Sequence, residues 1–75
     1  MAGKISIIGQ IAEIEREIGL RQQGYAKQVR EGRMRQEEAD MLMARIRAVL
    51  ATLHFCRENE ADIRAFVAAK KEGRA

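Results

Sequence analysis

Basic side chains gather around the middle of the chain, close to its single tyrosine. Arginine makes planar, bidentate contacts with phosphate, and a tyrosine ring offers a face on which a base can stack. In an oligomer, such clusters from several chains can converge on one anionic ligand. The alternative is that they only solubilise one end of the protein, and the residues taken alone favour that alternative. The candidate ligand-binding residues are Arg21, Tyr25, Lys27, Arg30, Arg33 and Arg35.

No arrangement of residues in the sequence has the chemistry of a catalytic or metal site. Nucleophilic catalysis needs a Ser, Thr or Cys held against a base. Cys56 and His54 stand two residues apart, and a helix turns such residues about 200° away from each other. His54 and Glu58 can meet on one helix face, but two ligands do not make a metal site. With no phosphate-binding glycine motif either, we expect a protein that is not an enzyme and uses no cofactor or metal.

The composition predicts one small all-α domain, spanning residues 1–75. Apolar residues make up 47% of the 75 residues and charged residues 33%, with no Pro and no Trp, which suits amphipathic helices better than disorder. So short a chain buries little surface, and partners are therefore expected. The net charge of +3 favours a polyanion without demanding one. Acidic residues beside the basic cluster, at Glu31, Glu37 and Glu38, argue against a plain DNA-binding surface.

Apolar spacing predicts an antiparallel hairpin of two long helices. The first segment runs from Ile5 to about Glu31, residues 31–35 form the turn, and the second segment begins at Gln36. Gly24 is the most favourable place for a break in the first segment, although an uninterrupted helix is favoured. A short turn between amphipathic helices implies antiparallel neighbours. The apolar seam of the first segment comprises Ile7, Ile11, Ile14, Ile18, Tyr25 and Val29.

The second segment carries more apolar surface than one neighbouring helix can cover. One stripe should face the first segment, and it comprises Ala39, Leu42 or Met43, Ile46, Val49 or Leu50, and Leu53. A thinner stripe lies to one side and should be covered by a second copy of the chain, most simply in a dimeric four-helix bundle. An alternative occupant is a helix of a host protein. The predicted oligomer or partner interface comprises Met41, Ala48, Thr52, Phe55 and Phe66.

The last part of the chain, after Asn59, allows two interpretations. Asn59 either caps a short third helix or lies on the polar side of a continuing second helix, and continuation is favoured. Residues 1–4 and 71–75 are expected to fray. The apolar N-terminal stretch reaches acidic residues by Glu13, too early for a signal peptide or membrane span. The lone Cys56 fits a reducing compartment, so we expect a cytoplasmic protein without a membrane partner.

About half of the chain carries a pattern of helical residues that is similar to one known group. The pattern combines a Glu-Arg-Glu run, an arginine, a tyrosine, a Gly-Arg-Met step, an Ala-Asp pair and an apolar run. These are Glu15 to Glu17, Arg21, Tyr25, Gly32 to Met34, Ala39 to Asp40 and Ala48 to Leu53. In these positions the chain resembles a family of small proteins encoded by bacteriophages and prophages. That family often has Pro after the tyrosine, where this chain has Ala26.

The resemblance implies a phage accessory protein acting inside an infected bacterium. Small phage proteins of this kind often inhibit a host defence or another host process by stoichiometric binding, either of a host protein or of a nucleotide signal. The family has no catalytic residues to carry over. A different hypothesis is a small nucleic-acid-binding accessory protein of phage replication or regulation, which the basic residues would also suit.

Overall fold

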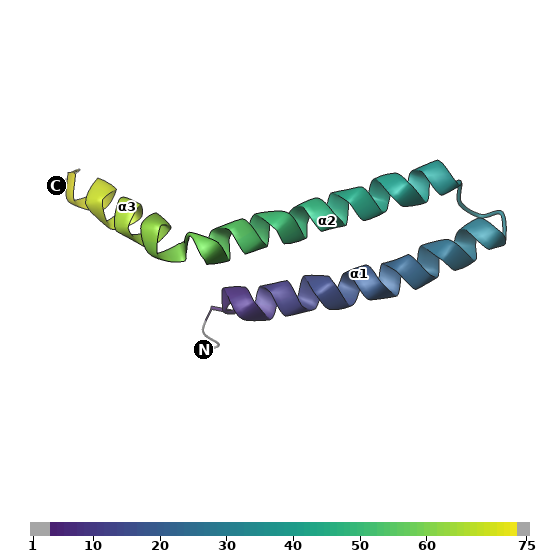
Figure 1. Cartoon of the computed structure of the whole chain (residues 1–75), viewed down its shortest axis with the longest axis horizontal. Helices are drawn as coiled ribbons and strands as arrows, with labels where there is room; N and C mark the ends of the chain where they lie inside the picture. Colours follow the sequence, from purple (N-terminus) through teal and green to yellow (C-terminus); the bar gives the residue numbers. More distant parts are fainter. Residues whose placement is uncertain (1–3, 74–75) are drawn as a thin grey trace.

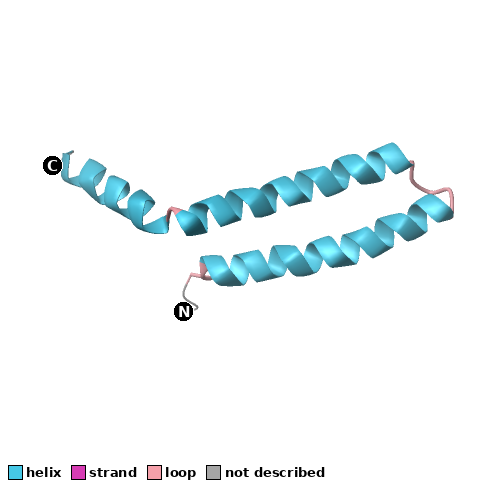
Figure 2. Cartoon of the chain, viewed as in Figure 1, coloured by secondary structure: helices cyan, strands magenta, loops and turns pink. Residues whose placement is uncertain are grey.

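The computed structural model describes residues 4–73, which form three helices and no strand (Figures 1 and 2). Helix α1 spans Ile7–Arg30, α2 spans Gln36–Glu58 and α3 spans Glu60–Gly73. Figure 1 shows α1 and α2 lying antiparallel along each other, with α3 extending past the open end of the hairpin. The described part is elongated, measuring 59 × 28 × 20 Å. The predicted all-α hairpin is confirmed.

Helix α1 begins at a serine cap and runs without a break to the turn. The Ser6 backbone is extended, and its Oγ accepts a hydrogen bond from the Gly9 N–H at 3.1 Å, which satisfies a free donor of the first turn. The helix continues through Gly24, so the favoured uninterrupted helix is confirmed. Pairing of the seam with α2 along its length explains why the glycines do not break it.

A glycine at positive φ ends α1 and starts the turn. Gly32 has φ +75°, a conformation that costs an L side chain about 1–2 kcal/mol. Its N–H donates to the Val29 carbonyl at 3.1 Å, while the Arg33 N–H donates to the Gln28 carbonyl at 2.8 Å. These two bonds make a Schellman motif, which satisfies carbonyls that the helix end leaves free. The chain then reverses over residues 31–35, as predicted.

The core lies between α1 and α2 and is small. Four apolar side chains are buried among the described residues: Ile11, Ala39, Met43 and Ile46. The structure decides between the two alternative residues at each open position of the α2 stripe that faces α1. Met43 is buried, whereas Leu42 is half-buried. Leu50 is half-buried, whereas Val49 is 47% exposed. With so little apolar surface removed from water, the single chain is expected to be marginally stable.

The favoured continuation of α2 beyond Asn59 is wrong, because the chain bends there and α3 is a separate helix. Asn59 has φ −112° and ψ 17°, outside α-helical geometry. Both its side-chain amide, at 2.8 Å, and its backbone N–H, at 3.1 Å, donate to the Phe55 carbonyl. Asparagine competes with the helix in this way. The Asn59 carbonyl then accepts the first bond of α3, from the Ile63 N–H at 2.9 Å.

Helix α3 buries none of its side chains and contacts only the end of α2. It extends to Gly73, so residues 71–73, which were expected to fray, have helical geometry. Residues 1–3 and 74–75 lie outside the described part, and the expectation for them stays untested. Over residues 4–73, no helix is both long and apolar enough to cross a bilayer.

Candidate binding surface at the turn

The turn end of the hairpin carries exposed basic side chains from α1 and from the turn itself. Lys27 and Arg30 lie in the last turn of α1, where their positive charge complements the negative end of the helix dipole. Arg33 and Arg35 follow in the turn, and all four residues are exposed. Stabilising the end of α1 therefore accounts for Lys27 and Arg30, while it leaves Arg33 and Arg35 without a comparable structural role.

Arg33 and Arg35 share an open depression of about 810 Å³ at the turn. Glu37 and Glu38 line the same depression from the first turn of α2, where acidic side chains complement the helix dipole. The Arg33 Nε lies 4.0 Å from the Glu31 Oε1, with the Arg33 side chain largely in solvent. Exposed pairs at such a distance contribute little. The guanidinium of Arg33 can therefore turn to an incoming anion.

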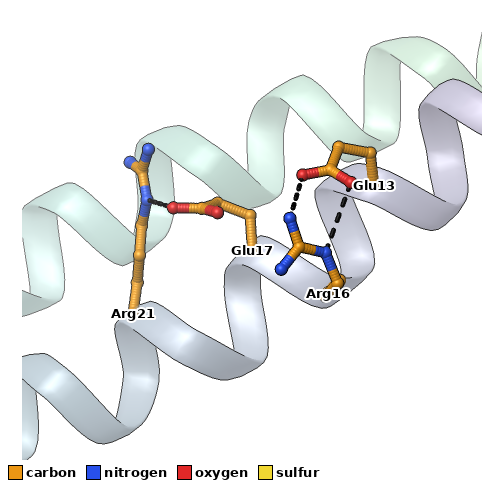
Figure 3. Close-up of polar contacts among 4 residues, drawn as sticks. All are labelled: Glu13, Arg16, Glu17 and Arg21. Atoms are coloured by element: carbon orange, nitrogen blue, oxygen red, sulfur yellow. Dashed lines mark hydrogen bonds and ion pairs between the residues drawn. The ribbon is translucent and has the colours of Figure 1, made fainter.

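Arg21 is held by a carboxylate of its own helix. Its Nε donates to the Glu17 Oε1 at 2.8 Å, one helical turn back (Figure 3). This hydrogen bond raises the pKa of Arg21 above its ordinary value, and the nearby Tyr25 adds a smaller contribution in the same direction. A ligand phosphate would have to compete with Glu17 for this guanidinium. Arg21 is therefore the least available of the predicted arginines.

Tyr25 is half-buried between the two long helices rather than displayed at the turn. It lines a cavity of about 210 Å³ together with Gln36, Asp40 and Arg47 of α2. Arg47 is absent from the predicted ligand-binding set. The signal that could have placed it there is the antiparallel register, since a short turn brings the first half of α2 beside the second half of α1.

The predicted ligand-binding residues thus occupy separate places in one chain. Arg33 and Arg35 meet at the turn, and Tyr25 lies in the cavity between the helices. Arg30 borders a third depression, of about 570 Å³, with Gly19, Gln23 and other residues on the side of α1. A single chain does not gather them around one ligand. Only a second copy, or a partner, could bring them together.

The exposed face of α1 also carries a second ion pair. Arg16 donates to both carboxylate oxygens of Glu13, at 2.5 and 3.3 Å, one turn apart on the helix (Figure 3). The hydrogen bond and the charge of Arg16 lower the pKa of Glu13 below its ordinary value. Exposed pairs of this spacing support an isolated helix only weakly. They also leave Arg16 engaged, unlike the arginines of the turn.

The residues of the predicted interface are all exposed in the single chain. Phe55 is 60% exposed and Phe66 68%, and Met41, Ala48 and Thr52 are also exposed. The Thr52 hydroxyl donates to the Ala48 carbonyl at 3.1 Å. An apolar groove of about 630 Å³ lies nearby at the open end, and Ile5, Ile8, Cys56 and Ile63 are among the residues that line it.

Side chains that could hold a metal are not grouped anywhere in residues 4–73. His54 lines a shallow depression with Glu15 and Arg47, and Cys56 lies in the groove at the open end. The two side chains therefore face different surroundings, as the helical spacing predicts.

The chain was compared with protein-family models, with curated proteins and with solved structures, and none of them matches.

Proposed function

We propose that this protein is a non-enzymatic, self-associating binding module that inhibits a host defence or another host process by stoichiometric binding. The observation that carries the proposal is the exposure of two unlike surfaces on one small hairpin. One is the basic turn, and the other is the apolar stripe of α2, with Met41, Ala48 and Phe55. A chain with so small a core gains stability by covering the stripe, which leaves the turn to face a ligand.

The bacteriophage resemblance supplies the setting of this proposal. A phage-encoded protein in the cytoplasm of an infected bacterium meets host proteins and nucleotide signals of defence systems. Binding in a fixed ratio requires no catalytic group, which is consistent with the lack of a paired nucleophile and base in the sequence. A ligand that carries phosphates suits Arg33 and Arg35, because guanidinium groups bind phosphate through two parallel hydrogen bonds.

Titration calorimetry against cyclic and ADP-ribose-type nucleotides tests the nucleotide version. We expect heat of binding with at least one of these signals, and its loss on Arg33→Ala. The matched control is Arg16→Ala, which removes another exposed arginine, one engaged by Glu13. Absence of heat across the whole panel would contradict nucleotide binding. Affinity capture from infected cells would then test binding of a host protein. Arg33→Ala and Phe55→Arg should each lose the captured partner.

A nucleic-acid-binding accessory protein is the second candidate, and the exposure of all four basic residues at the turn favours it. Such binding would rest on phosphate contacts, so the affinity should fall steeply with salt. A mobility-shift assay at low and moderate salt measures this dependence. The carboxylates of Glu37 and Glu38 in the same depression weigh against it, and no shift at low salt would exclude it.

A further inference from the structure

Helix α3 presents an apolar edge that nothing in the described chain covers. Ile63, Phe66 and Val67 follow the spacing of one helix face, and all three are exposed. A helix of 14 residues is marginal in water when nothing packs against it. Its Ile63 borders the open-end groove beside Ile5 and Ile8, but the backbone of α3 approaches only α2, so its own chain leaves Phe66 and Val67 without packing. Its stability therefore calls for another surface.

The charges of α3 indicate which surface fits. The helix begins with acidic residues and ends with basic ones, and Glu60 and Lys71 stand eleven residues apart. Eleven residues make about three helical turns, so these two side chains lie on the same edge of the apolar face. When two identical helices pair antiparallel, the same edges meet. Glu60, whose Oε1 accepts from Arg64 of its own helix at 2.7 Å, would then also face the partner subunit's Lys71. Parallel pairing would instead set the acidic start of one helix level with the acidic start of the other, and the basic ends level with each other.

We infer that α3 is a self-pairing arm, which docks antiparallel against α3 of a second copy of the chain. The apolar residues agree with this arrangement. A two-fold axis that pairs Glu60 with the partner subunit's Lys71 passes between residues 65 and 66, close to Phe66, and it sets Ile63 within one residue of the level of the partner subunit's Val67. Such an interface is isologous, so every contact occurs twice. The inference rests on the proposed self-association and adds which helix pairs and in which direction.

The antiparallel α3 pair also determines where the basic turns of the two copies lie in the dimer. Helix α3 extends past the open end of the hairpin, away from the turn (Figure 1). An antiparallel pair of α3 helices therefore puts the two basic turns at opposite ends of a long dimer. Each turn would meet its ligand independently, and the α2 stripe of each copy would remain for a further contact. A dimer built through α3 alone is thus open to growth into a larger assembly.

Charge reversal tests the direction of pairing in the full chain. Sedimentation velocity at low salt should show that Lys71→Glu raises the dimer dissociation constant about fivefold, because two attractive contacts become repulsive. The combined Lys71→Glu and Glu60→Lys variant should return to within about twofold of the wild type. The matched control is Glu72→Lys, an exposed reversal at the next residue, which the helix turns away from the apolar face, and it should leave the dissociation constant unchanged.

Cross-linking gives an independent measurement. In a Cys56→Ser background, Phe66→Cys should form a disulfide-linked dimer on mild oxidation, since the two copies of this position lie beside the two-fold axis. Leu20→Cys, at a 54% exposed position of α1, is the control and should stay monomeric on a denaturing gel.

The outcomes separate this inference from the broader proposal. The α3 pair is overturned if the double variant does not restore the dimer dissociation constant. It is also overturned if the Phe66→Cys protein does not cross-link. If Phe55→Glu disperses the oligomer and Phe66→Glu does not, the protein self-associates through α2, and only this inference fails. A protein that sediments as an 8.5 kDa monomer at every concentration contradicts both.

Discussion

The two ends of the hairpin differ in how completely one chain builds them. At the turn end, a Schellman motif satisfies the last carbonyls of α1, and Ala39 and Met43 of the adjoining α2 are buried. At the open end, the chain bends at Asn59, and Ile5, Ile8 and Phe55 remain exposed around the apolar groove and α3. The turn end leaves charged side chains exposed, whereas the open end leaves apolar side chains exposed. Under our proposal this difference separates two roles, with the open end serving assembly and the turn end serving binding.

Both ends of the hairpin depend on the core between α1 and α2. A substitution in that core should therefore have the largest effect on stability. Ile46 is 6% exposed, and Ile46→Ala should lower the free energy of unfolding by about 2–5 kcal/mol through the lost burial and the cavity. Urea denaturation followed by circular dichroism measures this. The control is Val49→Ala, three residues further along α2, where 47% of the residue is already in water. Equal losses for the two variants would mean that the seam is misplaced.

The assembly of the open end should be the next most sensitive feature. Phe55→Arg places a charge in the exposed stripe of α2, and we expect it to weaken self-association about tenfold or more, because desolvating an unpaired charge is unfavourable. Leu20→Arg changes an apolar residue of α1 with similar exposure and serves as the control. Light scattering over a dilution series reports both. A Phe55→Arg protein that remains as oligomeric as the wild type would remove the stripe from the interface.

The turn end should respond to a change in backbone conformation. Gly32→Ala forces an L side chain into positive φ, and we expect a loss of about 1–2 kcal/mol in the free energy of unfolding. Gly19→Ala is the matched control, because that glycine lies within α1 and an added Cβ would meet nothing within 4 Å. It should stabilise the protein by about 0.5–1 kcal/mol. Thermal melts distinguish the two, and a neutral Gly32→Ala would contradict the Schellman motif.

The smallest effect concerns the ion pairs of α1, which belong to neither end. The lowered pKa of Glu13 means that its pair with Arg16 stabilises the folded chain at pH values above the ordinary carboxyl value of 4.5. The contribution is lost as the pH falls through the lowered pKa of the folded state. We therefore expect a slight decrease in helicity on acidification, measured by circular dichroism. Glu13→Gln should flatten this part of the profile, and an unchanged profile would show that the pair is not formed in solution.

Most of the fold was predictable because local signals agreed. The isoleucine seam of α1, the glycine after Arg30 and the acidic start of α2 each indicate the same hairpin. The end of α2 was less predictable. Asn59 fits both a helix boundary and a polar helix face, and its hydrogen bond to the Phe55 carbonyl, which marks the bend, depends on a side-chain conformation that spacing does not reveal.

The candidate ligand-binding surface was predictable in composition but not in arrangement. The basic residues are close in sequence, which suggests one cluster. In the hairpin they point in different directions, because each step along a helix turns a side chain by about 100°. Arg33 and Arg35 therefore share a depression, while Tyr25 lines a separate cavity with Arg47, and Arg21 is held by Glu17.

The sequence by itself determined the helices, the turn and the excess of apolar surface, since these follow from residue spacing and from the conformational preferences of single residues. Tertiary structure alone decided which side chains the hairpin covers and which apolar side chains stay exposed at its open end. Those depend on the packing of α1 against α2 and on the direction in which α3 departs. The surfaces left uncovered by that packing are the ones through which we propose the protein acts.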